Sequence, residues 1–214
     1  MNFVKLALDN GGSIHPLILP HEELQGPSLT NPSVYNDNGK IIVNLRNINY
    51  TLYHAEKNKY ENHWGPLVYI HPENDMHLRT WNYLCEMDEN MRIKSYSKID
   101  TTDFPDQELW EFVGLEDCRI VRWDNNLYVS GVCRDLDTKG TGRMEICEIQ
   151  FVNNEVKQIS QFRIPTPVDK DSYCEKNWMP ITDMPFHYVK WTNGTEVVRV
   201  NPETKTCEQV CLKN

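Results

Sequence analysis

Three charged side chains crowd the start of one predicted strand in the middle of the chain. Glu116, Asp117 and Arg119 lie within residues 114–120, a segment whose other residues are of types that proteins bury. Buried charges are costly unless they are paired or used. A carboxylate pair beside a guanidinium can hold a protonated acid for proton transfer, or it can clamp a substrate. The structural alternative is an ion pair of Asp117 with Arg119 or another Arg that ties one strand end to its neighbour.

The composition of the chain restricts the functions that these residues can serve. The 214 residues suffice for one large domain or two small ones, and acidic residues outnumber basic ones 31 to 22. Without a cluster of Lys and Arg, the sequence argues against nucleic-acid binding. It has no apolar run long enough to span a membrane and no signal peptide is predicted. The seven cysteines lack metal-ligand or disulfide spacing, which favours reduced thiols, no bound metal and a cytoplasmic location.

Short apolar runs separated by turn residues predict an all-β protein. Helical periodicity is scarce, whereas Trp, Tyr, Val and Ile recur between Asn-Gly, Asp-Asn, Asn-Asn and Pro. Residues 1–27 are expected to form a lead-in strand and a Pro-rich connection, and residues 28–214 a single β domain. The polar stretch 56–75 is expected to be a long loop around one strand at 67–71.

Three segments of the chain share one plan. Each begins with polar residues, continues into an apolar strand, turns on Asn, Asp or Gly, and returns. Repeats of a multi-stranded β unit predict a propeller, in which the innermost strands converge on a central axis. In that arrangement Asn31, Asp117 and Lys176, which are distant in the sequence, become neighbours at one end of the channel.

Four motifs resemble one known family. Residues 114–120, Gly-Leu-Glu-Asp-Cys-Arg-Ile, resemble the Gly-x-Glu-Asp-Pro-Arg-Ile signature of the five-bladed β-propeller glycosidases related to the mannoside phosphorylases. Residues 29–33 are similar to the Phe-Asn-Pro-Gly motif of that family, and residues 42–46 to its Leu-x-Tyr-Arg strand. Residues 175–180 are similar to its Lys-bearing inner strand. The resemblance runs from about residue 28 to residue 205 and implies a five-bladed propeller, of which about three blades are present here.

The resemblance implies a role for each matching residue. Asp117 takes the position of the general acid, Asn31 and Arg46 those of the sugar ligands, and Lys176 that of the contact to phosphate or substrate. Cleaving a glycosidic bond requires a proton at the leaving oxygen, which a carboxylic acid of raised pKa supplies. Glu116 can raise that pKa, because two close carboxylates resist joint ionisation, and it is itself a candidate substrate contact.

Further ligands are expected around these residues. Tyr50 and Trp178 are expected to stack on a sugar face, and Arg134 and Asn177 are additional substrate-binding candidates, whereas Arg119 is expected to be structural. The substrate implied by the resemblance is an oligosaccharide or glycoconjugate of the β-mannoside type, cleaved by hydrolysis or phosphorolysis. Inorganic phosphate is the possible co-substrate, and no other cofactor is expected.

Alternatives to a complete glycosidase remain open. Three explanations of the missing blades are open: they belong to a longer protein, they come from another copy in a homo-oligomer, or the fold is reduced. The chain can also be a non-catalytic glycan-binding or assembly module. A third alternative is a glycosyltransferase, because Asp135-Leu136-Asp137 matches the Asp-x-Asp motif that binds a divalent metal and a nucleotide-sugar. That motif, however, lies just before residues 138–142, which have the composition of a hairpin tip.

Overall fold

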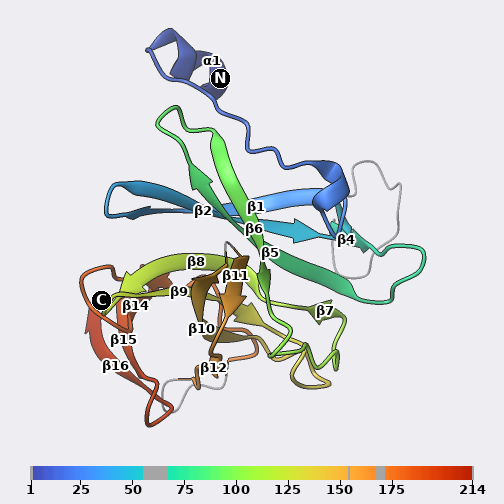
Figure 1. Cartoon of the computed structure of the whole chain (residues 1–214). Coiled ribbons are helices and arrows are strands. Elements are labelled where there is room, and N and C mark those ends of the chain that lie inside the picture. The colour runs from blue at the N-terminus through green and yellow to red at the C-terminus, as the bar shows by residue number, and fades with distance from the viewer. Residues whose placement is uncertain (1, 55–66, 154, 167–171, 214) are drawn as a thin grey trace.

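The computed structural model describes residues 2–54, 67–153, 155–166 and 172–213. Much of the predicted polar loop at 56–75 lies outside these residues. The all-β prediction is confirmed, since the described residues form sixteen strands, one α-helix and one 3-10 turn. Most of the strands belong to three antiparallel units of four strands each (Figure 1).

The first unit is a meander of four long strands. Each strand pairs antiparallel with the next, and the unit consists of β1 (Ser28–Asp37), β2 (Lys40–Ile48), β5 (Leu78–Met87) and β6 (Ile93–Asp100). Two shorter strands, β3 (Thr51–His54) and β4 (Leu67–Ile70), form a separate antiparallel ribbon. Strand β7 (Phe112–Val113) lies parallel to the start of β5.

The second and third units repeat this meander. The second consists of β8 (Glu116–Trp123), β9 (Asn126–Cys133), β10 (Arg143–Val152) and β11 (Glu155–Gln158), with the short β12 (Phe162–Arg163) beside β10. The third consists of β13 (Met179–Pro180), β14 (His187–Trp191), β15 (Thr195–Asn201) and β16 (Thr206–Lys213).

A parallel contact turns the first two units into one nearly closed, barrel-like sheet. Strand β6 pairs with β11, so the path through the sheet begins at β1 and ends at β8. These two end strands lie against each other. Side chains join them at both ends. Asn31 donates to Asp117 at 2.6 Å, and Arg122 holds Asp37 through two hydrogen bonds of 2.6 and 2.7 Å. We call this β1–β8 contact the seam.

Apolar side chains pack between the units in clusters. One lies between the first and second units, and another lies between the second and third and includes Trp123, Trp178 and Tyr188. A third covers the other face of the first unit, where Leu19 of the lead-in segment is buried against Val43 and its neighbours. The lead-in segment therefore completes the core of the first unit.

The expectation of a strand in the lead-in segment is wrong. Residues Phe3–Asp9 form helix α1, and His21–Glu23 form a 3-10 turn. The Asn2 side chain caps α1 by accepting from the Lys5 amide at 3.1 Å, and Lys5 pairs with Asp9 at 2.6 Å, which are contacts that favour a helix. No residue of α1 is buried, and the helix stands away from the sheets (Figure 1). No helix among the described residues is long and apolar enough to cross a membrane.

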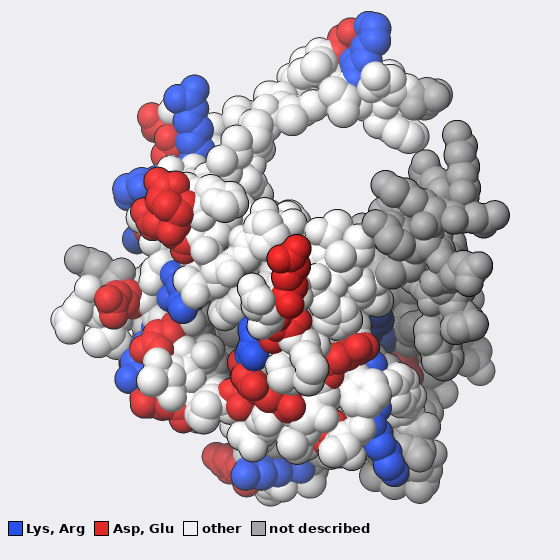
Figure 2. Space-filling view, turned by 90° about the vertical axis from the view of Figure 1, so that its right-hand side faces the viewer, with Lys and Arg blue, Asp and Glu red and all other residues white. Residues whose placement is uncertain are grey.

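Charged side chains of both signs are mixed over the surface. Figure 2 shows acidic and basic side chains next to one another on the face that it presents. Exposed pairs such as Lys94 with Glu86 and Lys157 with Asp103, each at 2.8 Å, account for part of this mixture.

All seven cysteines are free thiols. Five of them are buried, namely Cys85, Cys118, Cys133, Cys147 and Cys207. Burial raises the pKa of the Cys85 and Cys207 thiols to about 12 and that of the other three well above the usual range.

Candidate functional site

Two β-bulges at one end of the seam aim polar side chains at the same place. The pairing of β1 shifts between Thr30 and Ser33, and that of β8 shifts between Glu116 and Arg119. Asn31 (φ 44°) and Asp117 (φ 55°) lie within these shifts in the left-handed region, which Asn and Asp tolerate better than most residues. Bulges redirect side chains and are frequent beside functional sites.

The third unit contributes a residue of the same conformation. Asn177, two residues before β13, has φ 62°. The segment that contains it, residues 175–180, was predicted to be an inner strand and forms a strand only at Met179–Pro180. All three units thus present a left-handed Asn or Asp at the start of their first strand.

Asp117 is held by two donors from the first unit. Asn31 donates to Oδ1 of Asp117 at 2.6 Å, and Arg46 donates to the same oxygen at 2.8 Å. The structure therefore brings together three of the predicted residues, Asn31, Arg46 and Asp117, from β1, β2 and β8. The structural alternative, an ion pair of Asp117 with an arginine, is present in the structure, and the partner is Arg46 and not Arg119.

Arg46 is the buried centre of this cluster. Its guanidinium donates to the Thr80 hydroxyl at 3.2 Å and to the Tyr50 hydroxyl at 2.6 Å, and it lies 3.5 Å from Glu116. Burial alone would lower the pKa of Arg46, but Glu116, Tyr50 and Asp117 raise it. Arg46 is therefore a fixed cation that orients Asp117.

Tyr50 supports Arg46 from within the protein. Only 5% of Tyr50 is exposed, its ring meets Phe112 edge-on, and burial raises the pKa of its hydroxyl to about 12. The predicted role of Tyr50 is to stack on a sugar, and this would require the packing around its ring to open. In the structure the Tyr50 phenol holds the Arg46 guanidinium.

Glu116 lies beside Asp117 and is slightly more buried, with 13% of its side chain exposed against 19% for Asp117. Burial raises the pKa of Glu116, Arg46 opposes that rise, and the like charge of Asp117 adds to it. Its Oε1 atom is buried and accepts no hydrogen bond from the described residues, although Arg46 is nearby. A direct substrate contact from Glu116, as predicted, would need access to this enclosed oxygen.

A cavity of about 330 Å³ opens in front of Asp117. It is lined by Asn31, Pro32, Asp117, Arg119 and Asn177. Asp117 is the one carboxylate in this lining, so it is the group placed to exchange a proton with a molecule in the cavity. We call this space the seam cavity.

Lys176 and Arg134, the other predicted cations, lie near this site without lining the seam cavity. The charges of both lower the pKa of Glu116 and so oppose the effect of its burial. Lys176 is exposed, whereas Arg134 donates to the Gly140 carbonyl at 3.1 Å and to the Tyr173 hydroxyl at 2.9 Å. Arg134 thus already bridges two segments of its own chain.

Trp178 is a core residue. It is 1% exposed, and its indole N–H donates to Glu175 at 3.1 Å. Glu175 also pairs with Lys190 at 3.0 Å in a nearly buried cluster that the sequence analysis missed. Trp178 can stack on a sugar, as predicted, only if this core opens.

The Asp-x-Asp motif is engaged in local structure. Asp135 is 1% exposed and accepts from the backbone amides of Gln107 and Glu108 at 3.1 and 3.3 Å. Asp137 accepts from the amides of Lys139 and Thr141 at 2.8 and 3.2 Å. The two carboxylates hold loops, and the residues that the structure describes contain no His, Cys, Asp and Glu grouping suited to a metal.

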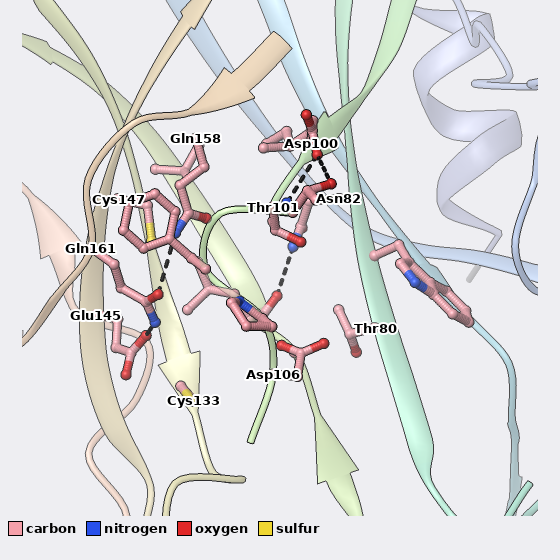
Figure 3. Close-up of a pocket in the computed structure, with 18 of the residues that line it drawn as sticks. Thr80, Asn82, Asp100, Thr101, Asp106, Cys133, Glu145, Cys147, Gln158 and Gln161 are labelled. Carbon is pink, nitrogen blue, oxygen red and sulfur yellow. Dashed lines mark hydrogen bonds between the residues drawn. The ribbon is translucent and has the colours of Figure 1, made fainter. Parts of the chain in front are cut away.

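A second cavity, of about 430 Å³, lies between the first and second units (Figure 3). Glu145, Gln161 and Gln158 form a hydrogen-bonded chain on one side, and Asp106 lies across from them. Burial and the charge of Asp135 raise the pKa of Asp106 to about 6. These residues were not predicted. Nothing in the sequence pattern distinguishes Glu145, because its strand also contains Glu148 and Gln150.

Comparisons with known proteins do not identify a family for the chain. No family model matches it, and no curated protein sequence matches it. The assignment of a function therefore depends on the residues around Asp117.

Proposed function

We propose that this chain is the carbohydrate-active part of a β-propeller that cleaves a glycosidic bond, with Asp117 as the general acid. The observation that carries the proposal is the meeting of Asn31, Arg46 and Asp117 at the seam cavity. A carboxyl held by an amide and a guanidinium, with room in front of it, suits proton delivery to a leaving oxygen.

The three antiparallel units support the propeller part of the proposal. Each consists of four strands, and the polar residues at the start of their first strands gather at one end. In a five-bladed propeller these strands would surround the central axis. The remaining blades would come from another segment of a longer protein or from another copy of the chain.

The lining of the seam cavity favours phosphorolysis over hydrolysis. An inverting hydrolase needs a second carboxylate, about 6.5–9.5 Å from the acid, to activate water. Among the described residues, the cavity lining offers only Asp117. A phosphate nucleophile needs no such base, and Lys176, whose charge acts on Glu116, is a cation near the site that can hold it. A β-mannoside-like substrate is the first to test.

The same lining supports a second candidate, a glycan-binding module without a reaction. Asn31, Asn177 and Arg119 offer hydrogen-bond donors to sugar hydroxyls, and Asp117 offers an acceptor. In this case Asp117 would bind a hydroxyl group and transfer no proton.

Turnover of a panel of β-mannosides, with and without phosphate, tests the proposal. We expect Asp117→Asn to lower kcat by about 10²–10⁴-fold, because the general acid is lost. The matched control is Asp124→Asn, an exposed turn residue, which should leave turnover unchanged. Dependence on phosphate would make the protein a phosphorylase.

Two results would contradict the proposal. One is turnover that survives Asp117→Asn, which would refute Asp117 as the general acid. The other is an absence of turnover combined with sugar binding that persists in Asp117→Asn but is lost in Arg46→Ala. This second result would leave the glycan-binding module.

A further inference from the structure

Arg119 lines the seam cavity and forms no ion pair with a described residue. Its Nε atom is buried and has no hydrogen-bond partner among the described residues. Other part-buried arginines differ, since Arg122 holds Asp37 and Arg79 holds both Asp75 and Glu108. A buried charged donor without a partner is costly, and such sites are often completed by a ligand.

Cations outnumber carboxylates around Arg119. Asp117 pairs with Arg46 at 2.8 Å, and burial raises the pKa of Glu116. Neither Arg119 nor the nearby Lys176 forms an ion pair with a described residue, although the whole chain has a net charge of −9. Three cations, Arg46, Arg119 and Lys176, therefore accompany two carboxylates, Asp117 and Glu116, so the local balance of charge differs in sign from that of the whole chain.

The donors beside Arg119 are arranged for an oxygen-rich group. Asn177 lines the same cavity, and Asn31 uses one of its two amide N–H bonds for Asp117. A volume of about 330 Å³ is at the lower end of the range for small-molecule sites, which is roughly 300–1,000 Å³. A single sugar ring with one substituent is a ligand of suitable size.

We propose that the seam cavity selects a sugar that carries an anionic group, a carboxylate or a phosphate, and that Arg119 binds this group. Guanidinium binds both groups through paired, charge-assisted hydrogen bonds. Arg119 is then the specificity-determining residue, while Asp117 faces the glycosidic oxygen. This inference depends on the proposed function, because it names the substrate class of the same site.

Calorimetric titration with matched sugars tests the inference. One pair is methyl glucuronide and methyl glucoside, a second is mannose 6-phosphate and mannose, and inorganic phosphate is titrated alone. We expect the anionic member of at least one pair to bind about tenfold more tightly, with an advantage that shrinks as salt rises. Arg119→Gln should remove this advantage, Arg119→Lys should keep part of it, and the exposed Arg92→Gln should not change it.

Equal affinity for both members of each pair in the native chain would overturn the inference, as would a preference that survives Arg119→Gln. Inorganic phosphate that binds as tightly as mannose 6-phosphate and loses this affinity in Arg119→Gln would also overturn it, because Arg119 would then hold free phosphate and not a sugar substituent. Failure of the proposed function is a separate result. Turnover that is independent of Asp117 would refute the general acid, whereas Asp117-dependent turnover without anion preference would refute only the role of Arg119.

Discussion

Glu116 and Asp117 are neighbours in the sequence, yet they lie in different surroundings. The β8 bulge turns Asp117 into the seam cavity, while Glu116 lies beside it with its pKa raised by burial. Arg46 contacts both side chains and is fixed by Thr80 and Tyr50. One carboxylate is thereby open to a ligand, and the other belongs to the interior.

Glu116→Gln should change how stability depends on pH. Because burial raises the pKa of Glu116 above 4.5 in the folded state, its contribution to stability is complete below that pH and is lost as pH rises through the folded-state pKa. Glutamine does not titrate, so the free energy of unfolding of the variant, relative to the native chain, should increase from acid to neutral pH. Urea unfolding at a series of pH values measures this difference. The exposed Glu155→Gln is the control, and a difference that stays constant with pH would contradict the prediction.

The polar residues of the site were predicted, but not how each is used. The repeated pattern grouped Asn31 with Asp117, and the resemblance to the glycosidase family added Arg46. Lys176, which the pattern placed with them, lies near the site without lining the cavity. The aromatic residues Tyr50 and Trp178 were expected to face a ligand, but tertiary packing buries them. Arg119 was expected to be structural. Only the observed pairing of Asp117 with Arg46 leaves Arg119 without a partner.

At the scale of the elements, the seam is where the two end strands of the barrel-like sheet meet. β1 and β8 are joined by side chains, Asn31 with Asp117 at one end and Asp37 with Arg122 at the other. The first contact serves the site and the second lies far from the cavity. The distant contact can therefore be altered without touching the chemistry.

Asp37→Asn should destabilise the protein by about 1.5–3 kcal/mol at neutral pH, because it removes a bidentate charged contact whose side chains are 14% and 26% exposed. The hydrogen bond from Arg122 lowers the pKa of Asp37 below 3.8, so this stabilisation is present above that pH and is lost as pH falls through the folded-state pKa. Urea unfolding at neutral and acid pH checks both statements. Asp9→Asn, which breaks an exposed pair, should have little effect. Equal effects of the two substitutions would refute a special role for the seam contact.

The strands were predicted well where a turn has a clear chemical signature. Asn38 and Gly39 both have positive φ, as do Asp124 and Asn125, which is the backbone of the tight hairpin turns that Asn, Asp and Gly favour. Helix α1 was missed because its short apolar run fits a strand equally well and its cap is a single Asn. The parallel pairing of β6 with β11 has no local signal, since it joins residues more than fifty positions apart.

At the scale of the whole molecule, the lead-in segment covers one face of the first unit, as a neighbouring unit would. Leu19, 4% exposed, packs with Leu17 and Leu24 on the face of the first unit that the second unit does not cover. The three units and their order were predicted from the repeated pattern. The packing of the lead-in segment on the first unit was not predicted, because it depends on which apolar face is left uncovered after the units have packed.

Leu19→Ala should lower the free energy of unfolding by about 2–5 kcal/mol, because it leaves a cavity in this cluster. The adjacent Ile18, which is 73% exposed, provides the control, and Ile18→Ala should change stability by less than about 0.5 kcal/mol. Thermal or urea unfolding of the two variants measures the difference. Similar stability of both would show that the lead-in segment does not contribute to the core.

The buried thiols can report which part of the molecule opens first. Cys85 lies in the cluster beneath the lead-in segment, Cys118 and Cys147 lie between the first and second units, and Cys207 lies between the second and third. Only a thiolate reacts quickly with an alkylating reagent, and burial holds each of these groups in the protonated form. The order in which these cysteines are alkylated therefore shows which of the three apolar clusters opens to solvent first.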